Sequence, residues 1–289
     1  MSQYQIHLND KLATAAEAGD VPLLRRLLSQ GADPRADDSF PFRLAAANGH
    51  LECLTTLLSI SDAKAKSSDA LQLASKGGHA ACVKFLIPVS DPMADSSLAL
   101  RWAARQGHVD CVAMLIPVSD PRAHDSYALR WAAESGYLEC VRLLISVSSP
   151  KVADSGALRV AAANGHAECV RLLIPASDPK GVNSAALELA ALNARASCVE
   201  LLLPVSLPIS TNPSPLRLAI SRGSANIVAL MISHDPSILA TLDLPRAIEL
   251  AVLHGHPELA ALLTSIVERQ DLANIIPSAG RESSRSTRI

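Results

Sequence analysis

The sequence predicts an all-α fold, an α-solenoid of about nine helix-turn-helix repeats. The first reason is the spacing of the six cysteines, each separated from the next by 29 residues: Cys53, Cys82, Cys111, Cys140, Cys169 and Cys198. The second is that the surrounding residues repeat as well, as in residues 99–108 (ALRWAARQGH), 128–137 (ALRWAAESGY) and 157–166 (ALRVAAANGH). Repeats of about this size are typical of solenoids, in which a unit cannot bury its apolar face alone.

The repeat frame gives one repeat domain over residues 1–275. Residues 276–289 are rich in serine and arginine, and we expect them to form a disordered tail. The repeats fall near residues 8–37, 38–66, 67–95, 96–124, 125–153, 154–182, 183–211, 212–243 and 244–272.

Each repeat carries two apolar stripes at helical spacing, which predict two short antiparallel helices. In the fifth repeat these stripes are Leu129, Ala132 and Ala133, then Leu138, Val141 and Leu144. A glycine ends each first helix and a proline commonly ends the second, as expected for a left-handed C-cap and a helix breaker. Serines stand just before the first helix, where we expect N-caps: Ser39, Ser68, Ser97, Ser126, Ser155 and Ser184.

Helices of about ten residues are marginal in isolation, so stacking has to stabilise them. One slot of the first helix supports lateral stacking. It is apolar in eight repeats, although it lies about 200° around the helix from the slot of Leu129. Its occupants are Leu44, Leu73, Trp102, Trp131, Val160, Leu189, Leu218 and Leu250.

The core Ala-Leu-Arg-x-Ala-Ala-x-x-Gly-His, followed by Val-Asp-Cys-Val-x-x-Leu-Ile, resembles the ankyrin repeat over about residues 8–270. The chain departs from that family in two ways. Its repeat is about four residues shorter than the usual ~33, with the shortage in the connector, so we expect stunted inter-repeat hairpins. Arginine also replaces the histidine of the family's Thr-Pro-Leu-His box, at Arg43, Arg101, Arg130, Arg159 and Arg217.

The resemblance implies a non-catalytic scaffold that binds a protein partner, without a cofactor, through the first-helix face that is concave in the family. The slots of Glu134 and Ser135 differ between repeats whose cores are nearly identical. The residues that we expect to contact the partner are Arg101, Arg105, Gln106, Arg130, Glu134, Ser135, Arg159 and Asn164.

Other interpretations stay open for these residues. A solvated helix face also varies without any purpose. The arginines have a structural role if they bond to connector carbonyls or to Asp125 and Asp154, and otherwise they attract an acidic partner. The alternative function is a nucleic-acid-binding solenoid. We do not expect one, because the net charge is −2 and we expect Trp102 and Trp131 to pack between repeats and so to be unavailable for base stacking.

The cysteine series invites a metal or redox interpretation, but we predict buried, reduced packing residues. Leu23, Ile227 and Leu259 occupy the same slot in other repeats, and helices packed about 8–10 Å apart are too distant for disulfides. The histidines after glycine occur once per repeat, so we predict turn contacts rather than metal ligands. We recognise no nucleophile with a base, no phosphate-binding loop and no metal-binding histidine pair, and so predict neither enzymatic activity nor a metal.

The composition bears on solubility and cellular location. The 289 residues are 49% apolar with eight aromatics, the start lacks the pattern of a signal peptide, and no apolar run approaches about 18 residues. We therefore expect a soluble, cytoplasmic monomer with no membrane partner. Arrays of short, aromatic-poor repeats with this sequence pattern are also similar to ankyrin proteins of bacteria, including ones delivered into host cells. A bacterial effector is therefore one hypothesis.

Overall fold

The computed structural model describes residues 2–206 and 215–282, and this part of the chain consists of helices joined by short connectors, with no strand, as predicted. In these two ranges, eighteen α-helices follow one another in pairs. The first helices of the pairs are α1 (Gln3–Ala18), α3 (Ala36–Ala47), α5 (Ala65–Gly77), α7 (Ala94–Gln106), α9 (Ala123–Ser135), α11 (Val152–Asn164), α13 (Gly181–Leu192), α15 (Pro215–Ser221) and α17 (Leu244–Leu253).

The second helices are shorter in most pairs. They are α2 (Val21–Ser29), α4 (Leu51–Leu57), α6 (Ala80–Leu86), α8 (Val109–Leu115), α10 (Leu138–Ile145), α12 (Ala167–Leu173), α14 (Ala196–Leu202), α16 (Ala225–His234) and α18 (Pro257–Glu282). Proline ends several of them in a 3-10 turn: η1 (Ile87–Val89), η2 (Ile116–Val118), η3 (Ile174–Ala176) and η4 (Leu203–Val205). A further 3-10 helix, η5 (Pro236–Thr241), links α16 to α17.

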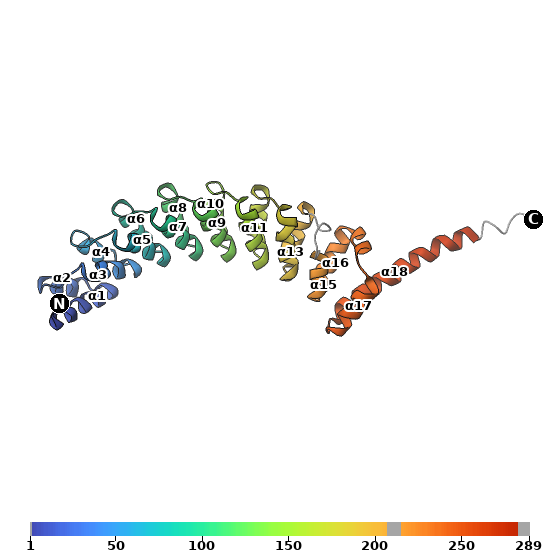
Figure 1. Ribbon diagram of the computed structural model, residues 1–289, viewed down its shortest axis with the longest axis horizontal. Coiled ribbons are helices and arrows are strands. Elements are labelled where there is room, and N and C mark those ends of the chain that lie inside the picture. The colour runs from blue at the N-terminus through green and yellow to red at the C-terminus, as the bar shows by residue number, and fades with distance from the viewer. Residues whose placement is uncertain (1, 207–214, 283–289) are drawn as a thin grey trace, which may run out of the picture. The chain divides into compact units, whose positions relative to one another are not determined.

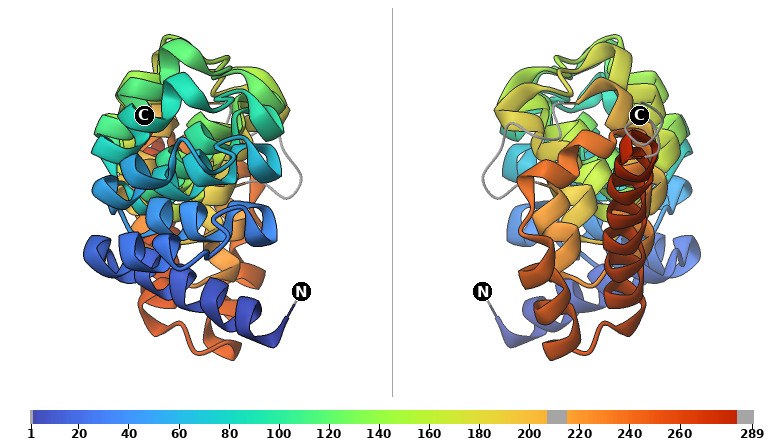
Figure 2. Two further views of the ribbon diagram at one scale, coloured as in Figure 1. Left: turned by 90° about the vertical axis from the view of Figure 1, so that its left-hand side faces the viewer. Right: turned by 90° about the vertical axis from the view of Figure 1, so that its right-hand side faces the viewer.

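The predicted repeat domain divides into two compact units. The first unit comprises residues 1–161 and 171–177, and the second comprises residues 162–170 and those from 178 onward. In the first unit, α1, α3, α5, α7 and α9 line one side and α2, α4, α6, α8 and α10 line the other (Figure 1). Seen from its N-terminal end, the pairs lie one behind another (Figure 2, left). Successive first helices pack more extensively than successive second helices, so the first-helix side is the more closely packed one.

The predicted apolar stripes form the core of each repeat. In the fourth repeat they are at most 1% exposed: Leu100, Ala103 and Ala104 from α7, and Cys111, Val112 and Leu115 from α8. The slot of Trp102 and Trp131 is only half-buried, and Leu250, its last member, is 41% exposed. Lateral stacking therefore covers part of these side chains and leaves the rest on the surface.

Within the described residues, the first helices of five repeats begin with an unpredicted left-handed turn. Three consecutive residues have positive φ in each, for example Asp95 (48°), Ser96 (56°) and Ser97 (59°). The same register recurs at residues 37–39, 66–68, 124–126 and 153–155. This conformation costs roughly 1–2 kcal/mol per non-glycine residue, so other contacts have to offset it.

The predicted serine N-caps are wrong, and the left-handed turn explains why. A capping serine has extended backbone and binds an N–H of its own helix, whereas these serines have positive φ. The hydroxyl groups of four of these serines instead accept hydrogen bonds from backbone N–H groups 23 residues further along, in the next connector. The donor–acceptor pairs are Asp62 and Ser39 (2.9 Å), Asp91 and Ser68 (2.8 Å), Asp120 and Ser97 (2.8 Å), and Ser149 and Ser126 (2.9 Å).

The glycines agree with their predicted role as C-caps, and aspartates cap the connectors. Gly78 ends α5 with φ 74°, a left-handed C-cap that a residue with a Cβ adopts only under strain. In the connectors, Asp62 Oδ1 accepts a hydrogen bond from the Lys64 N–H (2.9 Å), and Asp91 and Asp120 make the same local cap.

At the C-terminal end, α18 runs on to Glu282. Residues 276–282, which the sequence assigns to a disordered tail, therefore continue this helix, while residues 283–289 of that tail lie outside the described residues. Among the helices that the structure describes, none combines the length and apolar character needed to cross a membrane.

The serine bridge gives a stability prediction. Ser97→Ala removes a buried acceptor and leaves the Asp120 N–H unsatisfied, so we expect the free energy of unfolding to fall by about 1–3 kcal/mol. Ser96→Ala is the matched control, because Ser96 has nearly the same φ but is exposed; its effect should stay within about 0.5 kcal/mol. Urea unfolding followed by circular dichroism measures both. Equal losses would mean that the hydroxyl bridge contributes nothing.

Candidate functional site

The six cysteines are buried and unpaired, as predicted. Burial raises the pKa of every one of these thiols, and it raises the pKa of Cys111 and Cys140 to about 11, with smaller contributions from Asp110 and Glu139. A buried thiol that stays protonated at neutral pH is a poor nucleophile. No group of three or more His, Cys, Asp or Glu within residues 2–206 and 215–282 is placed to hold a metal ion.

The histidines after glycine are turn contacts between repeats, as predicted. The rings of His50, His79 and His108 lie against the glycine that ends the preceding first helix. Their Nε2 atoms lie 2.8, 2.9 and 3.0 Å from the carbonyl oxygens of Glu17, Ala47 and Lys76. A carbonyl can only accept, so Nε2 carries the proton and donates. These three imidazole rings are therefore engaged in contacts between repeats.

The arginine slot binds the left-handed turns, which favours its structural role. Arg43 donates through Nε to the Asp38 carbonyl (3.2 Å) and through Nη2 to the Asp37 carbonyl (3.0 Å). Its Nη1 pairs with Asp69 Oδ2 at 2.8 Å. One repeat on, Gln72 Nε2 donates to the Ser67 carbonyl (2.7 Å).

Arg101 continues the series by donating through Nη2 to the Asp95 carbonyl (2.6 Å). Burial lowers the pKa of Arg101, and Tyr127 and Asp95 oppose this shift. The Nε atoms of Arg101 and Arg159 are buried and have no hydrogen-bond partner among the described residues. The Arg101 guanidinium is thus held at the start of α7, partly shielded from water.

The structure exposes some of the predicted partner-binding residues and half-buries others. Arg105, Gln106, Glu134 and Ser135 are exposed, near the ends of α7 and α9. Arg101, Arg130 and Arg159 are half-buried. Asn164 is exposed but belongs to the second unit, so it is described separately from the other seven. Ser135 Oγ also donates to the Arg105 carbonyl (3.3 Å).

Sequence reasoning missed that these arginines lie among aromatic rings. We name seven residues of α5, α7 and α9 the cation–aromatic cluster: Lys76, Arg101, Trp102, Arg105, Tyr127, Arg130 and Trp131. The two indole rings lie 5.6 Å apart at 38°, and the Tyr127 ring meets the Trp131 ring edge-on at 4.8 Å. All three rings are half-buried.

Cations lie over these rings. Arg105 Cζ lies 5.4 Å from the centre of Trp102 and 4.8 Å from that of Trp131, so one guanidinium serves both indoles. Lys76 Nζ lies 4.7 Å from Trp102, and Arg130 Cζ lies 4.3 Å from Tyr127. The signal was present in the sequence, because Trp102 and Arg105 are three residues apart on one helix and so share a face.

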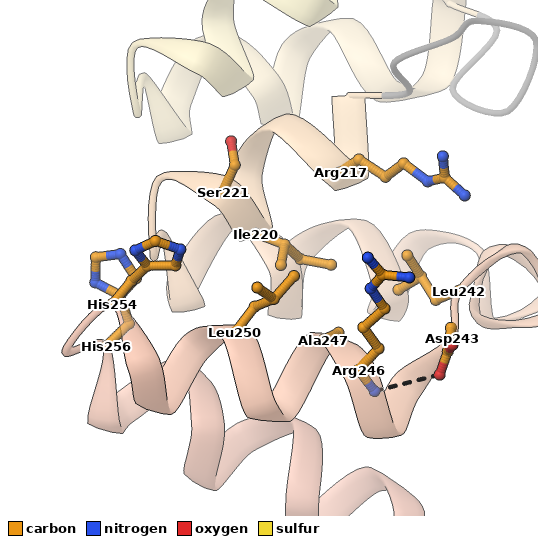
Figure 3. A pocket seen from close by; sticks show the side chains of 10 residues that line it. All are labelled: Arg217, Ile220, Ser221, Leu242, Asp243, Arg246, Ala247, Leu250, His254 and His256. Atoms are coloured by element: carbon orange, nitrogen blue, oxygen red, sulfur yellow. Dashed lines mark hydrogen bonds between the residues drawn. The ribbon is translucent and has the colours of Figure 1, made fainter.

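The second unit holds an apolar cleft of about 440 Å³ between α15 and α17 (Figure 3). Ile220 faces Leu250 and Ala247 across it, with Arg217 and Arg246 toward one end and His254 and His256 at the other. The polar groups of the cleft are engaged locally. The Ser221 hydroxyl donates to the Leu218 carbonyl (2.8 Å), and Asp243 Oδ1 accepts from the Arg246 N–H (3.2 Å). Beside the cleft, α17 exposes Val252 (65%) and Leu253 (75%).

Comparison with known proteins gives one family. The model described as ankyrin repeats (3 copies) matches residues 12–96, 42–125, 89–154 and 129–211, and these overlapping matches together cover residues 12–211. No curated protein matches the chain.

The raised thiol pKa values predict a pH dependence of stability. Unfolded thiols titrate near pH 9 and the native thiols of Cys111 and Cys140 near pH 11, so the native state holds these protons more tightly. Their contribution is complete below pH 9 and is lost as the pH rises to 11. We expect the free energy of unfolding to fall by at least about 2 kcal/mol over this window.

Urea unfolding at a series of pH values measures this loss. Cys111→Val with Cys140→Val is the control, because aliphatic residues occupy the same slot in other repeats. The double variant should lose less stability over the same window. Parallel curves for both proteins would refute a titration of these thiols.

Proposed function

Because the chain belongs to the ankyrin repeat family, we propose that it is a non-catalytic scaffold that binds a protein partner through its first-helix face. Ankyrin repeats are generally protein–protein interaction modules. The proposed contact residues in the first unit are Arg101, Arg105, Gln106, Arg130, Glu134, Ser135 and Arg159. Asn164 extends the proposal to the second unit.

One observation carries the proposal: an exposed slot changes from repeat to repeat above a core that does not change. Ala74, Ala103 and Ala132 are the same residue in three successive repeats and are all 0% exposed. Two residues further on, Lys76, Arg105 and Glu134 are all exposed and all different. Packing of the core does not constrain the residue type at this exposed slot. The residue there can therefore differ between repeats to suit a partner.

The arrangement of polar groups supports a role without catalysis. Catalysis requires unlike groups to converge on one reacting atom. Stacked repeats instead place like groups at corresponding positions, as with the buried cysteines and the arginine slot. Histidine is the usual base, and His50, His79 and His108 are engaged with carbonyl oxygens of the preceding repeat.

The alternative of a nucleic-acid-binding solenoid has less support. The chain carries a net charge of −2, whereas nucleic-acid affinity depends on an extended set of cations. Base stacking also needs free aromatic faces, and Lys76 and Arg105 lie over the rings of Trp102 and Trp131.

A capture experiment tests the proposed face. We expect a variant with Arg101, Arg105, Arg130 and Glu134 changed to alanine to lose the protein that the wild-type chain captures from a lysate of the source organism. The matched control changes Arg25, Lys84, Glu139 and Arg142 to alanine, which removes the same charges from exposed positions on the second helices. This control should retain the captured protein, and thermal melts should show that both variants fold.

Retention of every captured protein by the first variant would contradict the assignment of the first-helix face. Loss of the same protein by both variants would instead point to a general effect of charge.

A further inference from the structure

The cation–aromatic cluster has a sign of charge, which the general role of the fold does not specify. Four cations lie in it, Lys76, Arg101, Arg105 and Arg130, and Glu134 is the carboxylate of the same exposed slot on α9. The chain as a whole is slightly acidic, so this concentration of positive charge is local. A local positive patch favours encounter with negatively charged groups.

The two exposed cations of the cluster have no carboxylate partner in the described part of the chain. Among the side chains that the structure describes, Lys76 and Arg105 contact aromatic rings and form no ion pair with Asp or Glu. Four ion pairs of the first unit lie elsewhere, at Arg25 with Glu52, Arg43 with Asp69, Lys66 with Asp38 and Arg142 with Glu139. The cluster is therefore a place where added carboxylates gain partners without breaking existing ones.

The rings preorganise these cations. Arg105 lies over two indoles at 4.8 and 5.4 Å, which restricts a side chain that is otherwise rich in rotamers. A cation already held in place loses less conformational entropy when a partner binds. The indole rings are only half-buried, and their exposed part adds apolar contact area next to the charges. Tryptophan, tyrosine and arginine are the residues most enriched at the energetic centres of protein interfaces.

From these observations we propose that the cation–aromatic cluster binds an acidic segment of a protein partner, with Arg105 and Lys76 as the main contacts to its carboxylates. Arginine pairs with a carboxylate in a planar, bidentate geometry, which suits an aspartate or glutamate side chain laid against the indole rings. The proposal rests on the proposed function and adds the chemistry of the partner. A single-stranded nucleic acid is the competing occupant, and the covered indole faces argue against it.

The test uses the full chain and a fluorescent peptide of alternating glutamate and alanine. Fluorescence anisotropy measures the affinity, and tryptophan emission reports the position, because the only two tryptophans of the chain are Trp102 and Trp131. We expect saturable binding that changes tryptophan emission and weakens as salt is added. The same peptide with glutamine in place of glutamate should bind at least about tenfold more weakly.

Two variants and one control complete the design. Arg105→Ala and, separately, Lys76→Ala should each weaken peptide binding about tenfold. Arg142→Ala removes the same charge from the second helix of the repeat that contains Trp131, and its affinity should stay within about twofold of the wild type. If one of these two variants folds poorly, the other still measures the contribution of an exposed cation to peptide affinity.

Three results would overturn the proposal: equal binding of the glutamine peptide, equal weakening by Arg142→Ala, or tighter binding of a thymidine oligonucleotide of the same charge. The last of these would favour the nucleic-acid alternative. A further outcome separates the two proposals. If the glutamate peptide does not bind, but the four-residue face variant still loses the captured protein, then the acidic partner is refuted and the first-helix face remains supported.

Discussion

Most second helices of the described repeats are too short to be stable unless they are buried against adjacent helices. The second helices α4, α6 and α8 have seven residues each, well below the roughly 12–15 at which an isolated helix begins to persist in water. The core residues of these helices, such as Cys111, Val112 and Leu115 of α8, are nevertheless at most 1% exposed, because the adjacent pair supplies the missing surface. The same constraint makes equivalent side chains recur from one repeat to the next, which explains why the cysteines, histidines and arginines each have one role repeated many times.

The left-handed turns connect this stacking to the exposed face. Three successive non-glycine residues with positive φ are conformationally unfavourable, and hydrogen bonds made at the turn itself offset this free-energy cost. The serine hydroxyl at the end of the turn binds the next connector, while Arg43, Gln72 or Arg101 binds the carbonyl oxygens of the turn. The arginine slot is thereby tied to the framework. We propose that recognition relies instead on the slot four residues later, whose residues Lys76, Arg105 and Glu134 are exposed.

The sequence predicted what the repeat spacing determines: the helix pairs, the glycine C-caps, the buried cysteines and the histidine turn contacts. It did not predict the left-handed turns, because residues such as Asp95, Ser96 and Ser97 do not demand positive φ and the stabilising bonds come from the next repeat. The cluster was missed for a different reason. The slot of Trp131 lies only about 60° around the helix from that of Glu134, so an apolar residue there can be covered by a neighbour or border the exposed face. Three-dimensional contacts, which one sequence does not contain, decide between these.

The dependence of each repeat on its neighbours is tested most directly by excising one. A synthetic peptide of residues 96–124 contains one complete repeat, and most of these residues lie in α7 and α8 in the whole chain. Circular dichroism in water at neutral pH should show this peptide predominantly unfolded, while the full chain is strongly helical. A peptide that keeps the helical content these residues have in the full chain would contradict the account, because its helices would then be stable without lateral burial.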